Sequence, residues 1–336
     1  MTLTGPTTEA AEAKGSAGRA GAARAVALLT LVALGALIPL LGPSAALRGT
    51  GEAAAPGVSG IALLRAVLFA ALCVPAGELF VDRLVRRLPG VPDERPARWA
   101  PYAAAAGFVA ALGLASVVST GDLVPHSLGQ IDVGGLYRSR EGRLALLEVN
   151  AFLLAGLCAL SRRPATQAGP LAAVVVAEAL RAHPTTEHGP LLGSGLTLVH
   201  LTCAALWVGG LLSALRTLGR WRSDAAGAGL LGLYARVAAV LLAAITASGA
   251  WSSLRRMPPG TVLDQLTTTA YGRTVLAKVV LVGAVTVLAL CARRRLRRAA
   301  DPLSACVPAR VEVLALGLVV AVSGLLTALP LPIRWS

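Results

Sequence analysis

The sequence predicts an all-α fold: a polytopic transmembrane helical bundle of about nine spans, with the N-terminus inside and the C-terminus outside. Hydrophobic residues make up 55% of the chain. Charged residues make up 14%, against about 25% in an average soluble domain. The charged residues lie in short islands between long apolar runs, which is the pattern of transmembrane helices. The basic residues also favour alternate islands, which orients the bundle.

The N-terminal region allows two interpretations. Residues 1–22 are rich in Ala, Gly and Thr, and they predict a disordered cytoplasmic tail. The apolar run over residues 25–41 could be a signal peptide, because Ser44-Ala45-Ala46 resembles a cleavage site. An uncleaved first span is favoured, and the rest of the topology is the same in both cases.

The apolar runs divide the membrane part into two groups of spans. Residues 23–183 are expected to hold about five spans, and residues 190–330 are expected to form a second domain of four. The fifth span is short. The predicted spans cover residues 24–42, 59–80, 99–118, 143–160, 168–183, 191–215, 229–251, 270–292 and 309–329.

The positive charges test this topology. With the N-terminus inside, 19 of the 31 Lys and Arg residues fall in inner segments and nine in outer segments, as the positive-inside rule requires. The same arrangement explains the net charge of +14, so nucleic-acid binding is not needed to account for it. The Arg clusters lie between spans and lack interleaved aromatic residues. The sequence therefore predicts a multi-pass protein whose surroundings are the lipid bilayer of the plasma membrane.

Several ionisable residues fall inside the predicted spans, where they are energetically costly and usually face the bundle interior. Arg65, Arg236 and Glu312 lie near span ends, which favours structural ion pairs or snorkelling side chains. Glu178 and Lys278 lie deeper. For these two, a structural pair and a place in a transport pathway remain equally open.

All four histidines fall in the outer half of the predicted topology. His183 and His200 flank a short hairpin that carries His188, and His126 lies in the outer loop over residues 119–142. A neutral imidazole is the commonest transition-metal ligand, and it suits copper. The histidines therefore predict an outward-facing metal site, although their spacing alone does not separate copper from zinc or haem.

Two sulfur-containing residues are candidate partners of these histidines. Cys203 and Trp207 follow His200 at i+3 and i+7, on one helical face, and a thiol beside an imidazole could hold Cu(I). Met257 falls in the predicted outer loop over residues 252–269, where its thioether could do the same. Packing is the alternative for both sulfur-containing side chains.

From about residue 190 onward the chain resembles the CopD-like copper-resistance family. The stretch His200–Gly210 is similar to that family's H-x6-W-[VLI]-G-G span, and Ser248-Gly249 is similar to its [ST]-G at a span end. Tyr234–Ala238 resembles R-F-S-x-x-A in degenerate form. Tyr271–Arg273, with Lys278, resembles Y-G-R-x-L-x-x-K, and the basic run from Ala292 to Leu296 resembles N-R-R-R-L.

The resemblance implies that the protein handles copper ions, most simply by copper import or tolerance through an outward-facing site. Implied partners are a periplasmic copper-binding protein or a copper-requiring oxidase. A non-transporting copper-delivery or oxidase-assembly protein is an open alternative, and a b-type haem electron carrier is a weaker one because only His200 lies well within a span. No enzymatic activity is expected, because the chain lacks a nucleophile elbow, a zinc-protease helix and a nucleotide-binding loop.

Overall fold

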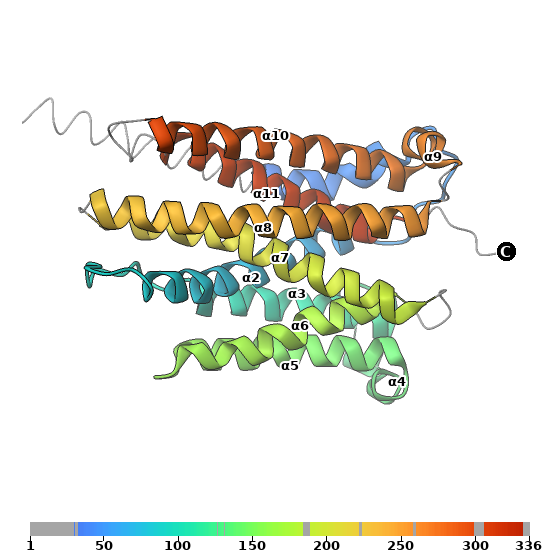
Figure 1. The fold of residues 1–336 in the computed structure, drawn as a ribbon. Helices are drawn as coiled ribbons and strands as arrows, with labels where there is room; N and C mark the ends of the chain where they lie inside the picture. Colours follow the sequence, from blue (N-terminus) through green and yellow to red (C-terminus); the bar gives the residue numbers. More distant parts are fainter. Residues whose placement is uncertain are drawn as a thin grey trace, which may run out of the picture.

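A computed structural model shows an antiparallel bundle of α-helices, and no strand occurs in the part of the chain that it describes (Figure 1). The described residues are 30, 33–125, 127–130, 132–183, 189–221, 224–257, 260–298 and 306–331. The predicted cytoplasmic tail, residues 1–22, lies outside them. The all-α prediction is confirmed for the described residues.

Among the described residues, seven helices are long and apolar enough to cross a membrane. They coincide with seven of the nine predicted spans. The long helices are α2 (Val58–Val85), α3 (Ala100–Thr120), α5 (Arg140–Leu160), α7 (Pro190–Leu218), α8 (Asp224–Arg256), α10 (Ala270–Arg298) and α11 (Cys306–Ala328). The short helices α4 (Val133–Arg138) and α9 (Val262–Thr268) lie at one end of the bundle (Figure 1).

The first and fifth predicted spans correspond to shorter helices. A helix over Ala33–Leu47 lies within the first, and α6 (Ala168–Arg181) matches the fifth. At 1.5 Å per residue, the 14 residues of α6 extend about 21 Å, less than the ~30 Å hydrocarbon core. Even so, α6 runs back along α5 toward the start of α7 (Figure 1). The bundle is thus multi-pass, while the count of nine and the orientation remain predictions.

Local sequence explains where several helices begin and end. The Ser139 hydroxyl accepts a hydrogen bond from the backbone N–H of Gly142 at 3.0 Å and so caps the start of α5. Gly121 ends α3 in the left-handed conformation, with φ 81°. Pro190 opens α7 directly after Gly189, whose φ is 65°.

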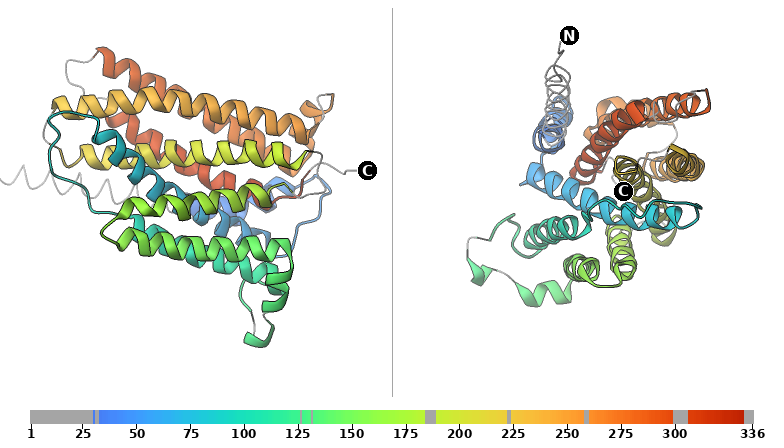
Figure 2. Two further views of the ribbon diagram at one scale, coloured as in Figure 1. Left: turned by 60° about the horizontal axis from the view of Figure 1, so that its bottom comes forward. Right: turned by 90° about the vertical axis from the view of Figure 1, so that its left-hand side faces the viewer.

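Helix α2 lies at the centre of the bundle and packs against α3, α7 and α11 (Figure 2). One apolar cluster joins α2 to α3, α5, α6 and α7. A second joins α2 to α7, α8, α10 and α11. Helices α2 and α7 therefore belong to both halves of the bundle and connect the predicted N-terminal group of spans to the second domain.

The crossing of α2 and α7 depends on two glycines. A Cβ at Gly209 of α7 would overlap the carbonyl oxygen of Cys73, and a Cβ at Gly77 of α2 would overlap the backbone of Gly209. The two backbones are thus in direct contact. Small residues are the usual means of such close approach between transmembrane helices.

Candidate functional site

His200 lies on α7 and its ring is held by α8. Its Nδ1 is 3.1 Å from the carbonyl oxygen of Ile245 and 3.1 Å from the Ser248 hydroxyl. A carbonyl oxygen can only accept, so Nδ1 carries the proton and donates it. The Ser248 hydroxyl donates to the carbonyl oxygen of Ala244 at 2.6 Å, which leaves its oxygen free to accept from His200. Nε2 of the imidazole therefore carries the lone pair, the arrangement found in metal-binding histidines.

Gly249 supplies the space for the same ring. A Cβ at this position would lie 3.2 Å from Cε1 of His200, a tight contact. Ser248 and Gly249 together form the seat of His200, so two stretches nearly fifty residues apart in the sequence meet at one imidazole. Both stretches are visible in the sequence, but their contact depends on how α7 packs against α8.

The Tyr271–Arg273 stretch builds a corner between α9 and α10. The Tyr271 hydroxyl accepts from Nη1 of Arg256 at 3.3 Å, and a Cβ at Gly272 would overlap the carbonyl oxygen of Gln265. Arg273 donates through Nε to the carbonyl oxygen of Thr267 at 2.7 Å. It also donates through Nη1 to the carbonyl oxygen of Arg48, again at 2.7 Å. These hydrogen bonds and close contacts hold the loops together at one end of the bundle. His200 lies near the same end.

Residues 228–326 match the family CopD, copper resistance protein D. The resemblance noted in the sequence is confirmed over this CopD segment, which spans most of α8, all of α9 and α10, and most of α11. No curated protein and no solved structure matched the chain. The CopD match includes the Ser248-Gly249 seat but not His200, which α7 contributes from outside the matched residues.

His183 is enclosed at the end of α6, where its side chain packs against α7. It is 2% exposed, and its Nε2 is 2.9 Å from the Thr197 hydroxyl. Its ring packs so closely on Gly193 that a Cβ there would overlap Nδ1. Gly193, Thr197 and His200 follow at spacings of four and three on one face of α7. The two imidazoles therefore lie along one helix face, with His200 about 4.5 Å deeper than Thr197.

Arginines from both halves of the bundle hold the segment that carries His183. Arg140 of α5 donates to the carbonyl oxygen of Leu180 at 2.6 Å. Arg256 of α8 donates to the carbonyl oxygen of Ala182 at 3.1 Å. Helix C-termini leave carbonyls without intrahelical partners, and these guanidinium groups satisfy them. The CopD segment, through Arg256, thus helps to position a residue of the N-terminal half.

Glu178 belongs to a buried ion network at the end of the bundle that carries His183. Its carboxylate oxygens are 2.5 Å from Nη1 of Arg65, and one of them is 3.3 Å from Nη1 of Arg181. The same Arg181 nitrogen is 2.8 Å from Glu148, whose side chain is 1% exposed. The network joins α2, α5 and α6. It gives Glu178 a packing role, which was one of the two alternatives left open by the sequence.

Lys278 of α10 lies close enough to His200 for its charge to act on the imidazole. It forms no hydrogen bond or ion pair with any described residue, unlike Glu178. A cation bound at His200 would therefore be repelled by the positive charge of Lys278.

The remaining predicted site residues divide into packed ones and ones that the structure does not describe. Trp207 is 3% exposed, and its carbonyl oxygen accepts from the Tyr234 hydroxyl at 2.7 Å. Cys203 is half-buried against the same core. Met257 directly follows α8 and is 1% exposed, packed with Tyr271 rather than open in a loop. His126 and His188 lie outside the described residues, and the predicted cluster of His126, His183 and His188 stays a prediction.

Within the described residues no group of three or more His, Cys, Asp or Glu side chains could hold a metal ion. His183, which follows α6, and His200 of α7 instead lie apart along one face of α7, each with a polar neighbour on another residue.

Proposed function

We propose that this protein moves copper ions inward across the plasma membrane, as an importer or tolerance protein, through successive weak sites on one face of α7. The observation that carries the proposal is the seat of His200, whose Nδ1–H is fixed by Ile245 and Ser248 so that Nε2 is free to bind a metal ion. The CopD match over residues 228–326 supports copper as the ion.

The proposed route begins at the outer end of the bundle. His183, with His126 and His188, would receive copper from a periplasmic copper-binding protein, or the same end would serve a copper-requiring oxidase. His200 would take the ion next, with the Cys203 thiol three residues further along α7. The nearby charge of Lys278 would keep the His200 site weak enough to release its ion. No covalent chemistry is required, and we propose no enzymatic activity.

Copper uptake into liposomes tests the proposal. The full-length protein is reconstituted with a Cu(I) indicator inside, and wild type is compared with His200→Ala. Because His200 supplies the imidazole of the proposed inner site, we expect the variant to reduce uptake to the level of empty liposomes. Leu198→Ala is the matched control, because Leu198 lies on the same helix and is 39% exposed toward the surroundings of the bundle. It should transport like wild type.

Two outcomes would overturn transport through His200. Uptake by His200→Ala at the wild-type rate would remove His200 from the route. Copper binding by the purified protein without uptake by wild type would instead support a non-transporting copper-delivery protein with the same outer site.

Replacing the hydroxyl that orients His200 should weaken copper binding without abolishing it. In Ser248→Ala the Ile245 carbonyl still fixes Nδ1–H, but the second acceptor is lost. Loss of one such outer contact lowers metal affinity by roughly tenfold. Competition with a Cu(I) chelator in detergent would measure the change. Equal affinities for Ser248→Ala and wild type would show that the Ser248 hydroxyl does not support copper binding at His200.

A further inference from the structure

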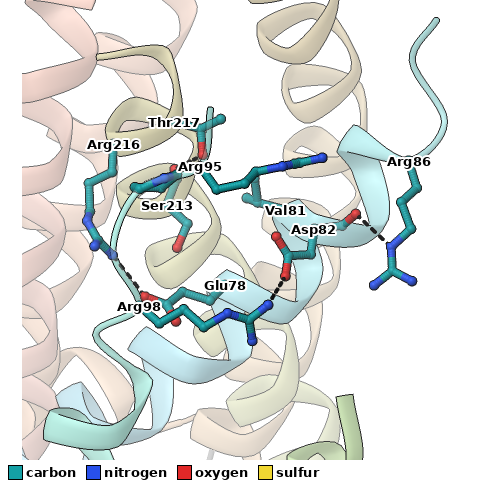
Figure 3. A pocket seen from close by; sticks show the side chains of 10 residues that line it. Glu78, Val81, Asp82, Arg86, Arg95, Arg98, Ser213, Arg216 and Thr217 are labelled. Atoms are coloured by element: carbon teal, nitrogen blue, oxygen red, sulfur yellow. Dashed lines mark hydrogen bonds and ion pairs between the residues drawn. The ribbon is translucent and has the colours of Figure 1, made fainter. Parts of the chain in front are cut away.

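A polar pocket lies at the end of the bundle opposite the His183 segment, between α2, α7 and the connection that leads to α3 (Figure 3). Its volume is about 280 Å³. This is the end that the sequence predicts to face the cytoplasm. The lining residues are Glu78, Val81, Asp82, Arg86, Arg95, Pro96, Arg98, Ser213, Arg216 and Thr217.

The pocket carries an excess of positive charge. Arg216 pairs with Glu78 at 2.9 Å, and Arg98 pairs with Asp82 at 3.1 Å. The two remaining arginines, Arg86 and Arg95, form no ion pair with a carboxylate of the described residues. Both acidic groups are therefore already matched. Arg86 donates through Nε to the backbone carbonyl oxygen of Asp82 at 3.3 Å, so part of its guanidinium group and all of that of Arg95 are left for an anion.

Ser213 adds an unsatisfied donor to the wall of this pocket. The residue is 4% exposed, and its hydroxyl has no hydrogen-bond partner among the described residues. Figure 3 shows its side chain among those that line the space. A buried hydroxyl without a partner is destabilising, and an oxygen atom of a bound anion would accept its proton.

Contacts within the protein hold the residues around the pocket in place without a bound anion. The carboxylate of Glu78 accepts from the backbone N–H of Trp99 at 2.7 Å and from that of Ala100 at 3.3 Å, and so caps α3. Arg216 stacks 3.7 Å from the centre of the Trp99 ring and donates to the carbonyl oxygen of Ala97. The charge of Glu78 is thus used by α3 and Arg216, so that it does not oppose an anion.

We propose that this pocket binds a phosphate group, held by Arg95 and the Ser213 hydroxyl, with the exposed Arg86 adding positive charge at the rim. Arginine suits phosphate because its planar fork donates two parallel hydrogen bonds. Basic pockets between transmembrane helices on the cytoplasmic side are typical sites for anionic lipid headgroups. The phosphate therefore belongs either to the headgroup of an anionic phospholipid or to a soluble phosphate compound. This inference is independent of the copper route, which lies toward the other end of α7.

Native mass spectrometry of the full-length protein in detergent tests the site with phosphatidylglycerol, phosphatidylcholine and inorganic phosphate as probes. We expect wild type to retain phosphatidylglycerol in preference to phosphatidylcholine. Arg86→Gln with Arg95→Gln should weaken phosphatidylglycerol binding by roughly tenfold or more, because each basic residue near the surface contributes several-fold. The matched control is Arg162→Gln with Arg163→Gln, which removes the same charge from two exposed arginines at the same end of the bundle and outside the pocket.

Ser213→Ala distinguishes binding in the pocket from non-specific attraction of the lipid to positive charge, because it removes one hydroxyl and leaves the net charge unchanged. We expect it to weaken phosphatidylglycerol binding while the lipid-free protein keeps its thermal stability, and it carries the test if the double arginine variant does not fold. Displacement of phosphatidylglycerol by inorganic phosphate would identify a soluble phosphate compound as the source, and no displacement would identify the lipid. Equal retention of both lipids together with no phosphate effect, or equal losses in the pocket and control double variants, would overturn the proposal.

Discussion

Gly209→Leu should prevent the protein from folding into a stable bundle. A Cβ at this position overlaps the carbonyl oxygen of Cys73 on α2, and a backbone atom cannot rotate away as a side chain can. Overpacking against movable side chains already costs about 1–3 kcal/mol, and we expect a larger loss here because α2 and α7 must separate. Since these two helices belong to both apolar clusters, their separation would loosen the whole bundle. Size-exclusion chromatography after detergent extraction should show aggregate in place of a monodisperse peak.

Matched glycines make this expectation specific to the crossing. Gly77→Ala places its Cβ on the backbone of Gly209 from the other side, so it should also destabilise, although its smaller side chain should leave some folded protein. Gly195 lies on the same helix as Gly209, and a Cβ there meets no atom within 4 Å. Gly195→Leu should therefore elute like wild type. A normal elution profile for Gly209→Leu would contradict the direct contact of α2 and α7.

The role of these glycines shows what the sequence could and could not predict. The Trp207–Gly210 stretch was recognised as part of a CopD-like motif, yet nothing in it indicates that Gly209 faces Gly77. That contact depends on how two helices more than a hundred residues apart are oriented. Gly210 has a similar explanation, because a Cβ there would lie 2.9 Å from Phe80 and 3.0 Å from Tyr234. Part of the motif thus serves helix packing, while His200 faces α8.

Helix positions were predictable because apolar runs of sufficient length have few other structures available. The hydrogen-bond and ion-pair partners of the polar side chains could not be predicted from the sequence. His200 was a candidate ligand from its residue type, but its hydrogen bonds to Ile245 and Ser248 require the register of α7 against α8. The pairing of Glu178 with Arg65 likewise joins residues 113 apart in sequence. Sequence periodicity gives the face of a helix, and tertiary packing decides which residue it meets.

Arg181→Met should destabilise the bundle by roughly 3–5 kcal/mol, the usual effect of removing one partner from a buried ion pair. Arg181 is the cation that contacts Glu148, at 2.8 Å, and Glu148 is 0% exposed. Glu178 would keep Arg65 at 2.5 Å, but Glu148 would be left as a buried carboxylate without a described counterion. Thermal unfolding in detergent, followed by the loss of the monomer peak on size-exclusion chromatography, would measure the change.

A second variant distinguishes the uncompensated charge from lost packing. Arg181→Met with Glu148→Leu removes both charges and fills the space with apolar groups, so it should recover most of the lost stability. Arg98→Met provides the control, because its pair with Asp82 is 42% and 32% exposed and such surface pairs contribute only about 0–1 kcal/mol. If the double variant were no more stable than Arg181→Met alone, the network would not act through the charge of Glu148. Recovery in the double variant would show that Arg181 stabilises the bundle mainly by compensating the buried charge of Glu148.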